Sequence, residues 1–507
     1  MRKTTNNQTN LRNGLLASIL FFFFAATAAA LPSTGATNLQ TTSGVTIGQS
    51  GNTLTFTAPD RAILSWNNFG SGTDTIAAGD TIQYNLPSAR ATVLNVVSGA
   101  NPTNINGYIE SNGGVYILNP NGIVVGNGAR IDTANLLLST VDSPLAAQFK
   151  FMQDGTVPSQ SGTRTAAGQV TVTGNAIMVT PNITINTKDF AFYGGLTGGN
   201  LTVNADGNVA LGSGVTMGYV SDTLTVNNPT GTTTLGQVGG YNVGANTALI
   251  VNTDTGTIAN QAGASVNTRN LVLTAPNGTI SVASATAPAV TANGKNVSVT
   301  FSPNTAAVIF TGSAAGNLAV SAPGFLTLAD VKNIGTGTST FTAGAKLTLG
   351  NVHIDASGVT SFTGASVFDS KPSVFVYGPT LFAATTGDVA ITGANHSFGP
   401  LSISAPLGNG TVYESATINL NAVNVKELIL KTNQAFFQTP LTASLTANKL
   451  SLGTQGDVVF STGTILNGVT ITAGAGNVDL SRLSLTTNLN NVAPTVTTTG
   501  TVTNPAQ

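Results

Sequence analysis

The chain has 507 residues, of which only 7% are charged, and its 18 lysines and arginines nearly balance 19 aspartates and glutamates. The net charge of −1 argues against nucleic-acid binding, which needs a basic surface, and the absence of cysteine excludes disulfides and thiolate metal sites. Hydrophobic residues make up 41% of the chain, which argues against disorder, and the 58 glycines favour a β-protein with many tight turns.

The first thirty residues have the pattern of a secretory signal peptide. Basic residues precede the apolar run 15–26, and the small residues Ala28 and Ala30 form a cleavage site before Leu31. A membrane anchor is the alternative, but the run is shorter than the ~20 apolar residues that span a bilayer. We therefore expect export through the Sec route and a mature chain that is not an integral membrane protein.

The most specific pattern of the chain lies within residues 93–140. At its centre, Asn119-Pro120-Asn121-Gly122 suits a type I turn between two apolar strands, because Asn is favoured at the first position and Pro at the second. Alone, this segment predicts only a good turn. The residues that form an ordered set around and within it are Asn95, Gly107, Asn112, Gly113, Asn119, Pro120, Asn121, Gly122 and Ile123.

With this ordered set just after a signal peptide, the stretch resembles the secretion domain of two-partner secretion exoproteins, the filamentous-haemagglutinin-like family. The strong resemblance covers about 80–150 and departs from the family at Val96, where an Arg is frequent. The resemblance implies a right-handed parallel β-helix with N-terminal capping strands. It also implies recognition by an outer-membrane barrel transporter with periplasmic domains. The family's exoproteins are largely adhesins.

From about residue 196 the chain carries a loose repeat of short strand, polar turn and short strand. Apolar and polar residues alternate within each strand, and only stacking of neighbouring repeats buries the apolar face. The pattern predicts an all-β solenoid with one coil per repeat, and a set of β-sandwich domains is the alternative. The repeats start at Leu201, Leu224, Leu249, Leu271, Val297, Leu318, Leu347, Leu428 and Leu450.

These patterns divide the chain into four parts. Residues 1–30 are the expected signal peptide and 31–190 the secretion domain. Residues 191–480 form the expected β-helical rod, and the Thr/Asn/Pro-rich stretch 481–507 has few bulky residues, so we expect a disordered tail.

The sequence offers little chemistry for catalysis. Carboxylates are scattered, and the GxSxG and HExxH patterns are absent. His353 and Asp355 would share one face of a strand, where a local polar contact is favoured over a metal or acid–base site. The other histidine, His396, lies in a loop-like sequence. We expect no enzyme, no cofactor and no metal site.

Three short aromatic clusters occur at 191–195, 374–378 and 434–438. Stacking inside the coils is the favoured interpretation, and glycan-binding surface patches are the alternative.

The sequence thus predicts an exoprotein that is secreted or held at the surface of a Gram-negative-type bacterium after passing the periplasm. Its expected role is adhesion to a host-cell or surface glycan or protein. A self-associating matrix or biofilm protein is the first alternative, and a β-helical carbohydrate-active enzyme is the second.

Overall fold

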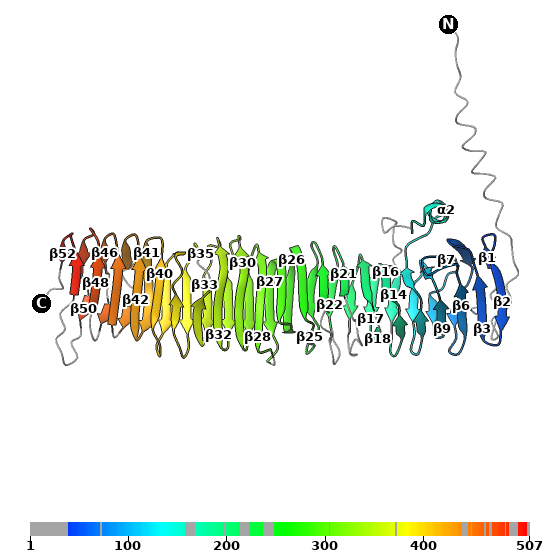
Figure 1. Cartoon of the computed structure of the whole chain (residues 1–507), viewed down its shortest axis with the longest axis horizontal. Coiled ribbons are helices and arrows are strands. Elements are labelled where there is room, and N and C mark those ends of the chain that lie inside the picture. The colour runs from blue at the N-terminus through cyan, green and yellow to red at the C-terminus, as the bar shows by residue number, and fades with distance from the viewer. Residues whose placement is uncertain are drawn as a thin grey trace, which may run out of the picture. The chain divides into compact units, whose positions relative to one another are not determined.

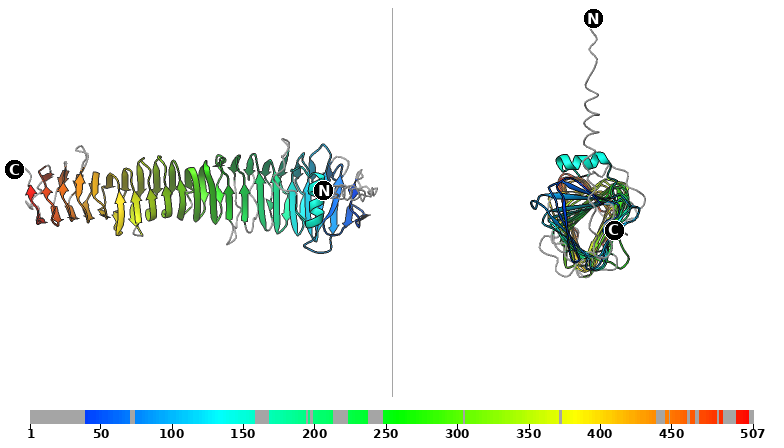
Figure 2. Two further views of the ribbon diagram at one scale, coloured as in Figure 1. Left: turned by 90° about the horizontal axis from the view of Figure 1, so that it is seen from above. Right: turned by 90° about the vertical axis from the view of Figure 1, so that its right-hand side faces the viewer.

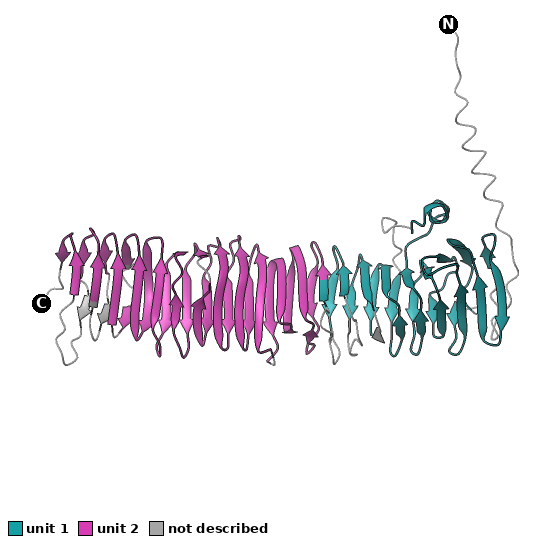
Figure 3. Cartoon of the chain, in the orientation of Figure 1, with its two compact units in different colours: residues 1–250 teal, residues 251–507 magenta. Residues whose placement is uncertain are grey.

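The chain folds into two compact units, residues 1–250 and 251–507, which we call the N-terminal and the C-terminal unit (Figure 3). Nearly all regular structure is β, and the described residues contain one helix, α2 (Leu145–Asp154). The computed structural model describes residues 39–70, 74–157, 168–193, 195–196, 199–212, 223–236, 248–303, 305–370, 373–438, 445–447, 449–460, 463–465, 469–481, 483–485 and 495–503.

The strands of the N-terminal unit are short because a bend follows every few residues (Figure 1). They are β1 (Gln40–Thr41), β2 (Thr46–Ser50), β3 (Thr53–Thr57), β4 (Ala62–Trp66), β5 (Thr75–Ile76), β6 (Thr81–Asn85), β7 (Thr92–Val97), β8 (Thr103–Ile105), β9 (Tyr108–Ser111), β10 (Gly114–Leu118), β11 (Ile123–Val125), β12 (Arg130–Asp132), β13 (Asn135–Ser139), β14 (Gln169–Val172), β15 (Ile177–Val179), β16 (Asn182–Thr187), β17 (Asp189–Phe192), β18 (Gly195–Leu196), β19 (Asn200–Ala205), β20 (Val209–Leu211), β21 (Thr223–Asn227) and β22 (Thr232–Leu235). The boundary between the units falls inside β23 (Ala248–Asn252).

The C-terminal unit also contains longer strands, of up to 17 residues, and register shifts interrupt the pairing of some of them. Its strands are β24 (Thr257–Asn260), β25 (Val266–Asn267), β26 (Asn270–Thr286), β27 (Ala289–Phe301), β28 (Ala307–Ala314), β29 (Leu318–Ala322), β30 (Phe325–Asn333), β31 (Ser339–Ala343), β32 (Lys346–Ile354), β33 (Thr360–Gly364), β34 (Ser366–Asp369), β35 (Ser373–Val376), β36 (Thr380–Ala384), β37 (Val389–Ile391), β38 (Asn395–Phe398), β39 (Leu401–Ala405), β40 (Gly410–Glu414), β41 (Ile418–Val425), β42 (Glu427–Thr432), β43 (Phe436–Gln438), β44 (Leu445–Ala447), β45 (Lys449–Thr454), β46 (Val458–Val459), β47 (Gly463–Ile465), β48 (Val469–Ala473), β49 (Val478–Asp479), β50 (Leu483–Leu485), β51 (Thr495–Thr498) and β52 (Val502–Thr503).

Strands of the N-terminal unit form three parallel ladders, in which strands of successive coils lie side by side (Figure 2). The first ladder runs β4-β7-β10-β13-β16-β19-β21. The second runs β5-β8-β11-β14-β17-β20-β22. The third runs β3-β6-β9-β12-β15-β18. A parallel β-helix results, because each strand of these ladders pairs with the equivalent strand one coil away.

Two antiparallel strands close the N-terminal edge of this stack. β1 pairs with β4, and β2 pairs over five residues with β3. Capping of this kind protects backbone groups that would otherwise pair with another chain. The expected all-β parallel β-helix with N-terminal capping strands is therefore confirmed.

The register in the C-terminal unit tests the sequence repeat directly. Val297 pairs with Leu318, and Leu428 pairs with Leu450, as their spacing predicted. Two predicted steps are wrong. Leu271 pairs with Val290 and not with Val297, which pairs with Ile280. Leu347 pairs with Leu326 and not with Leu318. Strands of different ladders share the same apolar alternation, so spacing alone does not distinguish them.

Aromatic rings stack inside the C-terminal unit. The ring of Phe362 lies between those of Phe341 and Phe382, with centroid distances of 5.3 and 5.2 Å, and all three side chains are buried. Rings one coil apart can pack face to face because the parallel register places them directly above one another.

The three aromatic clusters of the sequence contain both buried and exposed side chains. Phe192 and Phe436 are buried, as core stacking requires. Tyr377 is 62% exposed and Phe437 is 37% exposed, so surface positions also occur in these clusters.

The stretch expected to be a disordered tail, 481–507, contains β50, β51 and β52 among its described residues. β51 pairs in parallel with β48, and β52 pairs in parallel with β49. Regular backbone pairing therefore reaches at least Thr503. Both strands are rich in threonine and valine, which are good strand formers.

We predict that Phe362→Ala lowers the free energy of unfolding by about 3–5 kcal/mol, because a buried ring is lost from the middle of a stack. The measurement is the denaturant midpoint of the purified protein. Phe325→Ala is the matched control, since that side chain is 53% exposed and its loss leaves no internal cavity. Equal shifts of the denaturant midpoint in the two variants would contradict the proposed contribution of the ring stack to stability.

A second prediction concerns Glu414, whose side chain is 4% exposed. Burial raises its pKa to about 8, although its Oε1 accepts a hydrogen bond from the Phe398 N–H at 2.8 Å. The native state therefore holds a proton that the unfolded chain releases near 4.5, and stability falls as pH rises from there to about 8.

Through this one group, the free energy of unfolding falls by at most ~1.4 kcal/mol per pH unit. Glu414→Gln should remove this part of the decline, which denaturant midpoints measured across the same pH window would reveal. A variant that loses stability with pH as steeply as the wild type would refute the assignment.

Candidate functional site

The Asn-Pro-Asn-Gly segment forms the predicted turn between β10 and β11. The Gly122 N–H donates to the Asn119 carbonyl at 3.1 Å, which closes the turn. The Asn119 side-chain oxygen accepts from the Asn121 N–H at 3.0 Å. Gly122 has φ +122°, a backbone conformation that favours glycine. The local sequence chemistry therefore accounts for the shape of the turn.

The amide of Asn119 is directed into the protein. Its side chain is fully buried, and Nδ2 donates to the Asn101 carbonyl and to Thr103 Oγ1, both at 2.9 Å. Its backbone N–H donates to the Ser139 carbonyl at 2.9 Å. Asn119 thus joins the preceding coil, which holds Asn101 and Thr103, to the following coil, which holds Ser139.

The other residues of the turn are partly accessible. Asn121 Nδ2 donates to the Gly99 carbonyl at 2.6 Å, and both Pro120 and Asn121 are half-buried. Ile123 is fully buried in β11. The turn therefore presents one edge, formed by Pro120 and Asn121, at the surface.

Asn95 is a second buried amide with all its side-chain bonds inside the coil. Its Oδ1 accepts from Trp66 Nε1 at 3.0 Å and from the Tyr84 hydroxyl at 2.8 Å. Its Nδ2 donates to the Tyr116 carbonyl at 3.2 Å. Burial raises the pKa of Tyr84, so this hydroxyl remains a hydrogen-bond donor. Trp66 and Tyr84 were not among the predicted residues, although bulky polar-tipped aromatics at inward positions are a usable signal.

Gly107 and Gly113 lie where successive coils approach most closely. A Cβ at Gly107 would come within 2.4 Å of the Ala77 and Asp80 carbonyl oxygens. A Cβ at Gly113 would come within 2.5 Å of the Ala91 carbonyl oxygen. Glycine is required at both positions by contact with the neighbouring backbone.

The side chain of Asn112 forms the two hydrogen bonds to Leu86 that a backbone partner would otherwise form. Its Oδ1 accepts from the Leu86 N–H at 2.8 Å, and its Nδ2 donates to the Leu86 carbonyl at 2.7 Å. An amide can satisfy one residue's donor and acceptor together in this way. Like Asn95 and Asn119, Asn112 holds two coils together.

Helix α2 is inserted between β13 and β14 and lies outside the coil (Figure 1). Its Phe151 is buried, and the ring meets Tyr116 edge-on at 6.0 Å. Gly155 ends the helix with φ 76°, and the Arg61 guanidinium donates to the Gln153 carbonyl at 2.6 Å. The buried residues that pack with Phe151 are Ile63, Leu94, Val96, Leu118 and Leu137. The helix therefore covers an apolar patch on the outer side of the first ladder.

A cleft of about 480 Å³ lies between the turn and the start of α2. It brings together Pro120 and Asn121 with the segment that leads into the helix. The buried Ser143 Oγ has no hydrogen-bond partner there among the described residues. Beside the cleft, Leu145 is 61% exposed. The lining residues are Val96, Val97, Ser98, Gly99, Leu118, Pro120, Asn121, Asp142, Ser143, Pro144 and Gln148.

The remaining residues singled out in the sequence are the two alanines of the cleavage site and the two histidines. Ala28 and Ala30 lie outside the described residues, so the cleavage site stays a prediction. His353 Nε2 does meet Asp355 Oδ1, at 3.0 Å. The expectation of a loop at His396 is wrong, because it is buried in β38, where Nε2 lies 3.2 Å from Asp369 Oδ2.

Neither histidine belongs to a larger ligand set. Over the ranges that the structure describes, no group of three or more His, Cys, Asp or Glu side chains could hold a metal ion. Within the same ranges, no helix is long and apolar enough to cross a membrane.

Comparison with known proteins identifies the family. A family model described as the TPS secretion domain matches residues 27–285, which is more than half of the chain. The chain therefore belongs to the two-partner secretion exoproteins. The match extends beyond the expected boundary at residue 190, and it contains all the motif residues from Asn95 to Ile123.

Two curated relatives match shorter stretches. A heme/hemopexin-binding protein of Haemophilus influenzae strain Rd is 29% identical over 155 residues, which are 30% of this chain and 16% of that protein. A second Haemophilus influenzae heme/hemopexin-binding protein is 35% identical over 83 residues, which are 16% of this chain and 8% of the relative. The aligned stretches thus span a small part of these relatives.

Among solved structures, the HMW1 secretion domain from Haemophilus influenzae aligns at 15% identity. The alignment covers 90% of this chain and 97% of that chain, with a TM-score of 0.25. The fold of the present chain rests on its own strand register and not on this likeness.

We predict that Gly107→Ala destabilises the protein by about 2 kcal/mol or more, because the added methyl group overlaps two backbone carbonyls. The measurement is the thermal unfolding midpoint. Gly48→Ala is the control, since nothing lies within 4 Å of its added Cβ. If both variants had the same thermal unfolding midpoint as the wild type, the close backbone approach would not require glycine at position 107.

Proposed function

We propose that this chain is an exported adhesin whose N-terminal unit is recognised by an outer-membrane barrel transporter through the cleft beside the Asn-Pro-Asn-Gly turn. Family membership supports the export route. The cleft supports the place of recognition, because it combines the accessible edge of the family motif with the exposed first turn of α2.

One observation carries the assignment to the cleft. Asn95 and Asn119, the motif's buried amides, have no exposed surface, and their hydrogen bonds are made inside the coils. A partner that docks on the folded unit therefore meets the shape that these residues maintain, and not their side chains. Pro120, Asn121 and Asp142 are the neighbouring groups within a partner's reach.

The apolar character of this surface favours a protein partner. Leu145 is exposed beside the cleft, whose walls include Val96 and Leu118. A few well-packed side chains near the centre of a concave surface contribute most of the binding energy in many protein interfaces. The single charged lining residue, Asp142, suits a partner with a basic or neutral counterpart.

The physical properties of the chain suit passage through a pore. With no cysteine, no disulfide can lock the chain before it crosses. Pairing joins residues about one coil apart, so coils that leave the pore can fold one after another, each onto the coil before it.

The adhesive role is supported by the surface of the C-terminal unit, which displays large apolar side chains from several coils. Solitary exposed apolar residues are ordinary, but here large ones occur at various positions of several coils. Among them are Ile309, Phe325, Ile334, Val359, Tyr377 and Leu407. A self-associating matrix protein would use the same surface, and absence of catalysis stays a prediction.

The binding properties in the relatives' names are not carried over to this chain. Both heme/hemopexin-binding proteins align over 16% or less of their own length.

We predict that the double variant Asp142→Arg with Leu145→Glu folds normally but is secreted poorly when expressed with the partner transporter. Loss of about 1.4 kcal/mol of binding would weaken recognition about tenfold. The amounts in medium and periplasm are measured by immunoblot, and the fold is checked by the unfolding midpoint of protein recovered from the periplasm.

Two comparisons make this test specific. Asp330→Arg, an exposed acid of the C-terminal unit, should be secreted like the wild type. Asn119→Ala should lower both secretion and stability, because it leaves the Asn101 carbonyl without its donor. Normal secretion of the double variant would refute the cleft as the recognition surface.

A further inference from the structure

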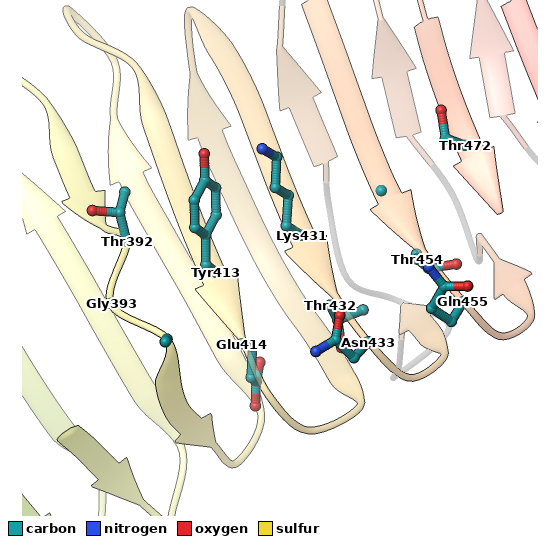
Figure 4. Close-up of a pocket in the computed structure, with 12 residues that line it drawn as sticks. Thr392, Gly393, Tyr413, Glu414, Lys431, Thr432, Asn433, Thr454, Gln455 and Thr472 are labelled. Atoms are coloured by element: carbon teal, nitrogen blue, oxygen red, sulfur yellow. The ribbon is translucent and has the colours of Figure 1, made fainter. Parts of the chain in front are cut away.

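A second cleft, of about 440 Å³, lies in the C-terminal unit where successive strands end (Figure 4). It follows the parallel pairing of Tyr413 with Lys431, of Lys431 with Gly453 and of Gly453 with Thr472. The residues that line it are Thr392, Gly393, Ala394, Tyr413, Glu414, Lys431, Thr432, Asn433, Gly453, Thr454, Gln455 and Thr472.

The hollow exists because glycine interrupts a row of side chains. Gly453 lies in register between Lys431 and Thr472, and a Cβ added there would touch nothing closer than Lys431 Cγ, at 3.7 Å. No positive φ requires glycine at this position. The missing side chain therefore leaves room that the backbone does not need.

Lys431 is the cation of this cleft. Its ammonium group lies 4.7 Å from the centre of the Tyr413 ring, and it has no ion-pair partner among the described residues. The ring holds the charge in place by cation–π attraction without neutralising it. A negative group on a ligand could therefore pair with Lys431.

The carboxyl group in the lining does not oppose a negative ligand. Glu414 Oε2 is buried and has no hydrogen-bond partner, while Oε1 accepts from the Phe398 N–H. Burial raises the pKa of Glu414 to about 8, so most of this group is protonated at neutral pH. The cleft therefore has a net positive charge.

The other accessible polar groups are neutral. Asn433 and Gln455 carry exposed amides, and Thr392 and Thr472 carry exposed hydroxyls. Amides and hydroxyls both donate and accept, so they match a ligand with many hydroxyl groups. Apart from Ala394 and the Tyr413 ring, the lining offers no apolar side chain, which suits a ligand whose surface consists mainly of hydroxyl groups.

We propose that this cleft binds an acidic saccharide, with the sugar carboxylate against Lys431 and the sugar hydroxyls against Asn433, Gln455 and Thr392. The volume is within the range of ligand sites of this kind. The inference deepens the adhesive function proposed above and rests on it for its biological meaning, but the binding itself is measurable on purified protein.

The test uses the full chain and four oligosaccharides in calorimetric titrations. Two carry a carboxylate, a tetrasaccharide of alternating glucuronic acid and N-acetylglucosamine and 3′-sialyllactose, and two are neutral, an N-acetylglucosamine tetrasaccharide and lactose. We expect at least one carboxylated ligand to bind about tenfold or more tightly than its neutral counterpart. Absence of binding by both carboxylated ligands, or equal binding of neutral ones, overturns the proposal.

Variants then assign the binding to this cleft. Lys431→Gln should weaken binding about tenfold or more, and Lys431→Arg should restore most of it. Gly453→Leu should abolish binding while leaving the unfolding midpoint near that of the wild type, because it fills space that is open. Lys346→Gln is the matched control, since Lys346 lies 4.4 Å over the Phe368 ring outside the cleft and should not matter.

The outcomes separate this inference from the proposed function. If the wild type adheres to cells but binds no acidic saccharide, the inference fails and the adhesive role stands on another surface. If it binds the saccharide but does not adhere to cells that display it, the adhesive role fails and the site stands. If Lys431→Gln and Lys346→Gln lost the same amount of saccharide affinity, the cleft would not be the binding site.

Discussion

The whole structure depends on one spacing, the ~4.8 Å between hydrogen-bonded strands of successive coils. Any residue at a bend must fit within this spacing or be replaced by glycine, which is the case at Gly107 and Gly113. The same spacing places Phe341, Phe362 and Phe382 in face contact. The stack of rings and the glycine positions are therefore two results of a single backbone constraint.

The motif residues acquire a physical meaning under this constraint. Asn95, Asn112 and Asn119 each use a side-chain amide to satisfy backbone or side-chain groups of another coil. Where the chain bends, regular backbone pairing stops, and buried polar groups still require partners. An ordered set of asparagines and glycines is thus the signature of coil edges that fit together. In the proposed function, recognition by a transporter depends on the surface that this fit creates.

The sequence predicted the coil but not all of its details. Period-two alternation and the spacing from Val297 to Leu318 identified the solenoid, because both follow directly from local backbone geometry. The turn at Asn119 was predictable for the same reason. The partners of Asn95 were not, since Trp66 and Tyr84 reach it only through the stacking of coils. Helix α2 was missed because its ten residues lie between strands and pack through essentially one buried side chain, Phe151. The cleft proposed to bind a saccharide was not predictable either. It depends on the pairing that places Gly453, which has no side chain, between Lys431 and Thr472.

Helix α2 has a consequence for how such a chain can change over evolution. Thr133 and Thr180 occupy equivalent positions in adjacent coils and share a hydrogen bond, although 47 residues separate them. Coils elsewhere need about half that length, as the 22 residues from Leu428 to Leu450 illustrate. Doubling a loop costs only about 0.6 kcal/mol of closure entropy. A bend in this fold can therefore accept a new segment, with a new surface, at almost no thermodynamic penalty to the strands on either side.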